Sequence, residues 1–164
     1  MIQSVQRQLM AQFDMTDIGL LHYFLGLQVH QSLDGIYIYQ QKYSLDLLQC
    51  FGMANCKVAP TPFQFGVTLT TSYTSPQVNP SLYRQLVGSL LYLTHTKPDI
   101  AFAVGLVSRF SQDPHESHWK VAKRILRYIK GTVRFGIQYT VGTPDLVGFT
   151  YSNWDGSVDD QKST

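Results

Sequence analysis

The sequence predicts an α+β fold, and three patterns predict it. Apolar residues recur every three to four positions over 2–14 and again from 81 to 131, which is the period of amphipathic helices. Two runs of alternating apolar residues flank Asp34-Gly35, which predicts a β-hairpin. Two short apolar runs, 135–139 and 146–152, are typical of strands. The chain has 164 residues, 44% of them hydrophobic, which suits one compact unit or two small ones.

The N-terminal third is predicted to contain a helix, the hairpin and a second helix. The first helix covers 2–14, and its apolar side is formed by Ile2, Val5, Leu9 and Phe13. The hairpin has one alternating run over 21–31 and a second over 36–40. A short helix over 42–53 follows, with Ser44 as its expected N-cap. Its apolar side is predicted to consist of Leu47, Leu48 and Phe51.

A connector and three helices are predicted next. Residues 54–80 hold four prolines among threonines and serines, which predicts an irregular connector less ordered than its neighbours. Helices are predicted over 81–96, 98–112 and 118–131, the second of them opened by Pro98. The apolar side of the first of these three is predicted to be Leu82, Leu86, Val87, Leu90 and either Leu93 or Thr94.

Composition limits the classes of function. Charged residues are 15% of the chain, below the roughly 25% of an average soluble domain, so some apolar surface is expected to face a partner. The net charge of +2 gives no whole-chain argument for nucleic acid. Cys50 and Cys56 lack metal-ligand spacing and are expected to be idle thiols in a reducing compartment. The sequence shows no signal-peptide core and no apolar stretch of about 20 residues, so we expect an intracellular protein without a transmembrane segment.

The strongest local signal is a row of cations in the helix predicted over 118–131. At helical spacing, one stripe carries Lys120, Lys123, Arg124, Arg127 and Lys130. The opposite side is apolar and consists of Ala122, Ile125, Leu126 and Ile129. No acid occurs between residues 117 and 134, and Arg134 extends the basic run. Such a row attracts phosphates without reading bases. The alternative is the solvated face of an amphipathic helix.

Aromatic and histidine residues give weaker signals. The hairpin carries an aromatic group that could stack on a primer end, namely Tyr23, Phe24, Tyr37 and Tyr39. Alternating aromatics are more often core residues or cross-strand pairs. His115 and His118 are one helical turn apart, but no third ligand lies nearby in the sequence. A surface position is therefore favoured over a metal site, and no metal ligand is assigned.

Asp159-Asp160 matches, in residue type, the paired aspartates that hold two Mg²⁺ ions in polymerases. A polymerase pair needs a hairpin turn between apolar strands, which directs both carboxylates at the metal ions. The residues on either side of Asp159-Asp160 show no strand pattern. A catalytic role is therefore not assigned to the pair.

Several longer stretches share their residues and their order with one known family. They read FDMTDIGLLHYFLGLQV, YSLDLLQCFGM, YRQLVGSLLYLTHTKPDIAFAV, SRFSQDP and HWKVAKRILRYIKGT, and they cover nearly the whole chain. They resemble the Pol polyprotein of copia-type long-terminal-repeat retrotransposons. The resemblance implies the C-terminal part of a reverse transcriptase that runs into the start of an RNase H domain.

The resemblance also implies a division of the chain. Residues 1–53 would end the palm and carry a primer-grip-like hairpin, and 54–80 would be the Pro/Thr/Ser-rich connector. Residues 81–134 would form a helical thumb-like or connection-like segment, and 135–164 the truncated start of an RNase H-like domain. The primer-grip-like residues would be Tyr23, Phe24, Gly26, Tyr37 and Tyr39.

Catalytic groups are placed by the same resemblance. The family's polymerase aspartate pair lies upstream of the stretch that starts at residue 13, so this chain is expected to lack it. The family's first RNase H aspartate aligns with Tyr151, and a phenol with a pKa of about 10 is a poor Mg²⁺ ligand at pH 7. A small alignment gap would move that position to Asn153, and Asp155 alone cannot hold two metal ions. We expect no catalytic residue and no cofactor in this chain, although the parent enzyme uses Mg²⁺.

The predicted function is a fragment of a copia-type reverse transcriptase and RNase H polyprotein, without catalytic activity of its own. One alternative is a non-catalytic module that binds RNA or DNA duplex, regardless of sequence, through the helix over 118–131. Another is a subunit completed in trans by the missing parts of the polyprotein. No membrane partner is expected.

Overall fold

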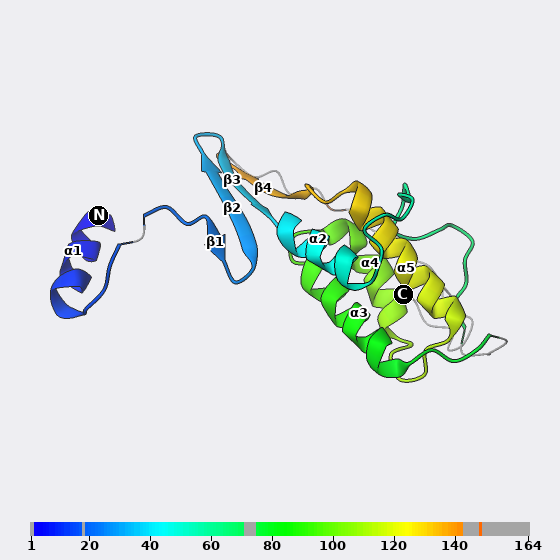
Figure 1. Ribbon diagram of the computed structural model, residues 1–164. Coiled ribbons are helices and arrows are strands. Elements are labelled where there is room, and N and C mark those ends of the chain that lie inside the picture. Colours follow the sequence, from blue (N-terminus) through cyan, green and yellow to red (C-terminus); the bar gives the residue numbers. More distant parts are fainter. Residues whose placement is uncertain (1, 18, 71–74, 143–147, 149–164) are drawn as a thin grey trace.

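The computed structural model describes residues 2–17, 19–70, 75–142 and 148 (Figure 1). The elements in chain order are α1 (Ile2–Gln12), β1 (Tyr23–Phe24), β2 (Leu27–Ser32), β3 (Gly35–Tyr39), α2 (Gln41–Cys50), α3 (Pro80–Leu93), the 3₁₀ turn η1 (Pro98–Ile100), α4 (Ala101–Ser108), α5 (Glu116–Gly131) and β4 (Gly136–Thr140). Among the described residues there are thus five α-helices and one antiparallel sheet of four strands, which confirms the predicted α+β class. The finer assignment to reverse transcriptase and RNase H subdomains stays a prediction.

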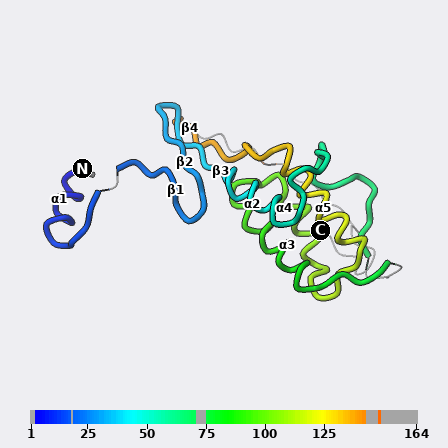
Figure 2. The backbone as a smooth tube through the Cα atoms, in the orientation of Figure 1, coloured from blue at the N-terminus to red at the C-terminus, as the bar shows by residue number. Residues whose placement is uncertain are grey.

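The sheet lies between α1 and a group formed by the other four helices (Figures 1 and 2). The hydrophobic core lies within that group of helices. It is formed mainly by Leu47, Leu48, Tyr83, Leu86, Val87, Leu90, Leu93, Ile100, Val104, Val107, Ile125, Leu126 and Ile129. The predicted apolar side of the basic helix is confirmed, since Ala122, Ile125, Leu126 and Ile129 are all fully buried.

The core side of α3 differs from the prediction at one position. Leu82 was expected in the core but is 41% exposed, whereas Tyr83 is fully buried. The Tyr83 hydroxyl donates to the Val107 carbonyl oxygen at 2.8 Å, so the ring is buried with its polar group satisfied. Burial also raises the pKa of Tyr83. Of the two alternatives at the end of the helix, Leu93 is the buried residue.

The hairpin predicted around Asp34-Gly35 is confirmed, with its turn one residue earlier. Ser32 pairs with Gly35, so Leu33 and Asp34 form the turn between β2 and β3. The single run predicted over 21–31 is wrong, because it folds back on itself at Leu25-Gly26. Both turn residues have positive φ, 47° and 80°, as the tight turns between antiparallel strands require. Residues 23–24 therefore form their own strand against β2.

Strand β4 joins the sheet from far along the chain. It pairs with β3 in antiparallel register, from Tyr39↔Gly136 to Gly35↔Thr140. The predicted strand over 135–139 is thus confirmed, but its partner was not predicted. Gly136 is required here, because a Cβ would collide with the Ile38 carbonyl oxygen. The second predicted strand, 146–152, lies outside the described residues apart from Gly148.

Several helix ends differ from the prediction because of their capping. Ser44 is not the N-cap of α2, since Gln40 occupies that position and the Ser44 hydroxyl donates to its carbonyl oxygen at 2.8 Å. Helix α3 begins at Pro80 because the Asn79 side chain accepts from the backbone N–H groups of Ser81 and Leu82. Pro98 opens a 3₁₀ turn that leads into α4.

The predicted connector is packed over part of its length. Ala59 is only 2% exposed, and its N–H donates to the Arg127 carbonyl oxygen on α5 at 3.2 Å. Phe63 and Leu69 pack against the core. Apolar side chains of the connector thus find partners in this stretch, and its lower order relative to its neighbours stays a prediction. Residues 71–74 lie outside the described residues.

Within residues 54–70, chymotrypsin is expected to cleave after Phe65 before it cleaves after Phe63. The Phe65 side chain is fully exposed, whereas the Phe63 ring lies 6.1 Å from the Phe102 ring in edge contact. A protease needs an accessible, locally unfolded segment. Mass spectrometry of early fragments tests this order. The early cut should vanish in Phe65→Ala and persist in Phe63→Ala; equal initial rates at the two sites in the parent chain would contradict the packing.

Candidate nucleic-acid interface

The five cations of the basic stripe on α5 fall into two groups that differ in their contacts. Its C-terminal half binds the connector. The Lys130 ammonium donates to the Cys56 carbonyl oxygen at 2.7 Å, and the Arg127 Nε donates to the Lys57 carbonyl oxygen at 2.8 Å. The Arg124 guanidinium donates to the Thr61 hydroxyl oxygen at 3.1 Å. These three cations therefore hold residues 56–61 against α5.

The two cations of the N-terminal half make their contacts within α5. Lys120 has a side chain that is 72% exposed and lies 3.2 Å from the Glu116 carboxylate, one turn earlier. Such an exposed pair contributes little and is screened by salt. The Lys123 ammonium lies 5.3 Å from the centre of the Trp119 ring, a cation–π contact. Of the five predicted cations, Lys120 and Lys123 are thus the two whose contacts stay on their own helix.

His115 and His118 are not surface residues, contrary to the prediction. His118 is fully buried and stacks on Phe110 with ring centres 4.0 Å apart. The His118 Nδ1 accepts from the His115 N–H at 3.0 Å, and the two side chains form a reciprocal capping box at the start of α5. The three-residue spacing of the two histidines was the signal in the sequence that could have indicated this capping box. It is the spacing of a capping box as well as of a ligand pair.

The residues predicted as primer-grip-like fall into two groups. Tyr23, Phe24 and Gly26 surround the β1–β2 turn, and Tyr37 and Tyr39 lie on β3 with their rings stacked 5.2 Å apart. The register aligns Tyr23 with Gln28, and Gln28 with Tyr39. Facing residues of paired strands share one face of a sheet, so the three tyrosines share a face and Phe24 belongs to the other.

The β1–β2 turn is fixed from the helical group. The Tyr92 hydroxyl on α3 donates to the Leu25 carbonyl oxygen. A Cβ at Gly26 would press on that same hydroxyl, and the positive φ of 80° favours glycine at this position. The turn still projects its side chains outward, since Tyr23, Phe24 and Leu25 are all exposed.

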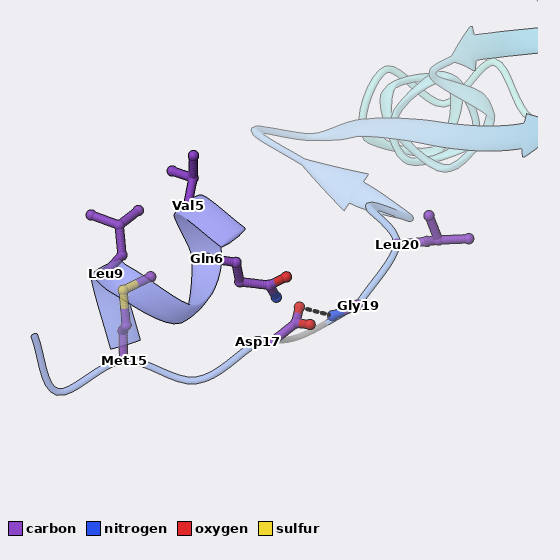
Figure 3. A pocket seen from close by; sticks show the side chains of 7 residues that line it. All are labelled: Val5, Gln6, Leu9, Met15, Asp17, Gly19 and Leu20. Atoms are coloured by element: carbon purple, nitrogen blue, oxygen red, sulfur yellow. Dashed lines mark hydrogen bonds between the residues drawn. The ribbon is translucent and has the colours of Figure 1, made fainter. Parts of the chain in front are cut away.

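Helix α1 leaves its apolar side largely open. Val5, Leu9 and Phe13 are 50%, 40% and 61% exposed. Figure 3 shows an open pocket beside this helix, lined by Val5, Leu9, Met15 and Leu20 among others, and the Gly19 N–H donates to the Asp17 carboxylate at 2.8 Å. The low charged fraction predicted exposed apolar surface, and this helix carries part of it.

Several residues that were considered for catalysis or metal binding are not among the described residues. Tyr151, Asp155, Asp159 and Asp160 lie outside them. Within 2–17, 19–70 and 75–142, no three His, Cys, Asp or Glu side chains are grouped to hold a metal ion. Cys50 and Cys56 are free thiols. Over the same part of the chain, no helix has the length and apolar content needed to cross a membrane.

Comparisons with known proteins give a consistent picture. Residues 1–65 match the family described as reverse transcriptase (RNA-dependent DNA polymerase). The chain is 38% identical over 145 residues to the retrovirus-related Pol polyprotein from transposon RE2 of Arabidopsis thaliana, covering 88% of this chain and 10% of that protein. It is 34% identical over 173 residues to the corresponding polyprotein from transposon TNT 1-94 of Nicotiana tabacum, covering 100% of this chain and 13% of that protein.

A further relative is not described as a transposon polyprotein. The chain is 36% identical over 158 residues to an uncharacterized mitochondrial protein of Arabidopsis thaliana, covering 96% of this chain and 65% of that protein. The chain thus spans about a tenth of the transposon polyproteins and under two thirds of this relative. No solved structure matches it.

Proposed function

The chain belongs to the reverse transcriptase family of copia-type retrotransposon Pol polyproteins, and on this premise we propose that it supports an RNA or DNA duplex within such an enzyme. The observation that carries the proposal is the β1–β2 turn, which is exposed and yet fixed. Tyr23, Phe24 and Leu25 are 51%, 53% and 76% exposed, while Tyr92 holds the backbone of the turn. Exposed rings on a fixed backbone can stack on a base with little further loss of entropy.

Positive charge for binding the duplex comes from the start of α5. Lys120 and Lys123 are available to phosphates because neither binds another segment of the described chain. Arg124, Arg127 and Lys130 already donate to residues 56–61. Contacts of this kind neutralise phosphates and release counterions, so they do not select a sequence. The proposed site is therefore smaller than the stripe of five cations that the sequence suggested.

Catalysis is not part of this proposal. No catalytic carboxylate is expected in this chain, and by the family resemblance Tyr151 stands at the position of the first RNase H aspartate. A neutral phenol does not replace a carboxylate that binds Mg²⁺. In this proposal the chain holds the duplex, residues 135–164 resemble the start of an RNase H-like domain, and the Mg²⁺-dependent steps belong to other parts of the polyprotein.

Replacing Lys120 and Lys123 together by glutamine is expected to weaken duplex binding and to flatten its salt dependence. Non-specific binding of the parent chain should have a Kd on the order of 10⁻⁴–10⁻⁶ M at physiological salt. Each phosphate contact contributes a slope of about −0.9 in log K against log salt on duplex DNA. Loss of two contacts should thus reduce the slope by about 1.8, measured by fluorescence anisotropy with a labelled primer–template.

Two control variants separate binding from folding. Arg7→Gln removes an exposed cation on α1, outside both α5 and the β1–β2 turn, and should leave the slope unchanged. Arg127→Gln should lower the free energy of unfolding by about 1 kcal/mol, because the Lys57 carbonyl loses its donor, with little effect on the slope. If the Lys120 and Lys123 double variant binds duplex with the parent slope, α5 is only a solvated helix face.

A further inference from the structure

A second pocket lies where the sheet meets the helical group. It has a volume of about 460 Å³ and is formed by residues from β3, the 95–99 segment, α5 and the start of β4. The lining side chains that matter are Tyr37, Thr96, Asp99, Tyr128 and Phe135. The pocket exists because β4 returns to pair with β3, which brings Phe135 beside Tyr37. It is separate from both the β1–β2 turn and the start of α5.

The walls of this pocket combine three aromatic rings with one carboxylate. The Tyr128 hydroxyl donates to the Asp99 Oδ2 at 2.6 Å. Asp99 makes no hydrogen bond through Oδ1 within the described structure, so that oxygen can accept from a ligand. The Tyr37 hydroxyl donates to the Arg134 carbonyl oxygen and is therefore not free for a ligand. None of the residues that line the pocket is a lysine or an arginine.

A buried cation, Lys97, lies over one ring of the pocket wall and interacts with the Asp99 charge. Lys97 is fully buried, and its ammonium donates to the Thr132 carbonyl oxygen, with the Thr132 hydroxyl at 3.5 Å. It lies 5.6 Å from the centre of the Phe135 ring. Burial and the bond to Asp99 raise the pKa of Tyr128 to about 12, so the phenol stays protonated and donates at neutral pH. The pocket thus presents one carboxylate, whose charge the buried Lys97 ammonium offsets in part, together with aromatic faces.

We propose that this pocket binds a planar cation, the guanidinium of an arginine side chain presented by a protein partner. A guanidinium offers parallel N–H donors that match a carboxylate, and its flat face stacks on aromatic rings. Rings around a cation add electrostatic attraction through their quadrupoles. A phosphate is disfavoured, because Asp99 would repel it and none of the lining residues is a cation that could donate to it.

The test uses the full chain with N-acetyl-L-arginine methylamide as the probe and its citrulline counterpart as the neutral isostere. Titration is followed by the backbone NMR signals of Asp99, Tyr128 and Phe135. The arginine probe should shift these signals with a Kd in the millimolar range, as expected for one charge-assisted contact. The citrulline probe should bind at least about 10-fold more weakly, which corresponds to losing one such contact.

Asp99→Asn provides the second arm. It keeps an oxygen for the Tyr128 hydroxyl but removes the charge, and it should reduce binding of the arginine probe about 10-fold or more. The matched control is Asp46→Asn, an exposed aspartate on α2 that should change nothing. Equal shifts with both probes would overturn the proposal. So would guanosine that shifts the same signals more strongly than arginine, since the pocket would then be a nucleobase site. The comparison of probes on the parent chain decides the question even if a variant fails to fold.

Discussion

Replacing Leu86 by alanine is expected to lower the free energy of unfolding by about 2–5 kcal/mol, whereas the same change at Leu82 should cost less than about 1 kcal/mol. The two leucines lie one turn apart on α3 and were both predicted to face the core. Leu86 is fully buried, and Leu82 is 41% exposed. A buried leucine loses its transfer free energy and leaves a cavity when it is truncated, while an exposed one loses little.

Urea denaturation followed by circular dichroism measures both changes under the same conditions. Because residue type, helix and substitution are the same, helix propensity cancels between the two variants. Equal losses would mean that Leu82 is covered in solution, for example by another molecule. Tyr83→Phe adds a finer control: its loss should be about 1 kcal/mol, since it removes the bond to the Val107 carbonyl oxygen and keeps the ring buried.

The elements that the sequence predicted well depend on local patterns. Helix α5 combines a clean apolar side with a polar one, and all four residues predicted for its apolar side are buried. The β2–β3 hairpin was readable because two alternating runs flank a turn signal. The prediction was wrong at Leu82 because choosing core residues by apolar character alone favoured leucine over Tyr83. A tyrosine can be fully buried when its hydroxyl finds a partner, here a helix carbonyl oxygen 24 positions away.

The features that were missed depend on contacts between distant parts of the chain. Pairing of β4 with β3 joins residues about 100 positions apart, and short strands carry no mark of their partner. The same holds for the stripe on α5. Helical spacing placed Arg124, Arg127 and Lys130 on one side correctly, but nothing local indicated that backbone oxygens of residues 56–57 and the Thr61 hydroxyl would occupy them. Lys97 was missed because a single lysine before a proline gives no sign of burial.

The stability of the parent chain is expected to rise between about pH 7 and about pH 9.5, by about 1–2 kcal/mol relative to Lys97→Met. Burial lowers the pKa of Lys97 to about 8 from its ordinary value of 10.5, and the nearby Asp99 charge offsets part of that effect. Between these two values the unfolded chain holds a proton that the folded chain has released. Stability therefore increases with pH in this window. Below pH 8 the folded protein carries the full cost of a buried ammonium.

The variant isolates this lysine from other groups that titrate. Lys97→Met keeps a long side chain in the same space but cannot ionise, so the difference between the two proteins reports on Lys97 alone. The scan stops near pH 9.5 because raised pKa values at Tyr37, Tyr83 and Tyr128 lower stability as the pH passes about 10. Lys120→Met, at a side chain that is 72% exposed, should show no such difference. The stability difference between the parent chain and Lys97→Met should therefore change with pH across this window. If it does not, the ammonium reaches water, and its bond to Thr132 does not fix the junction between α5 and β4.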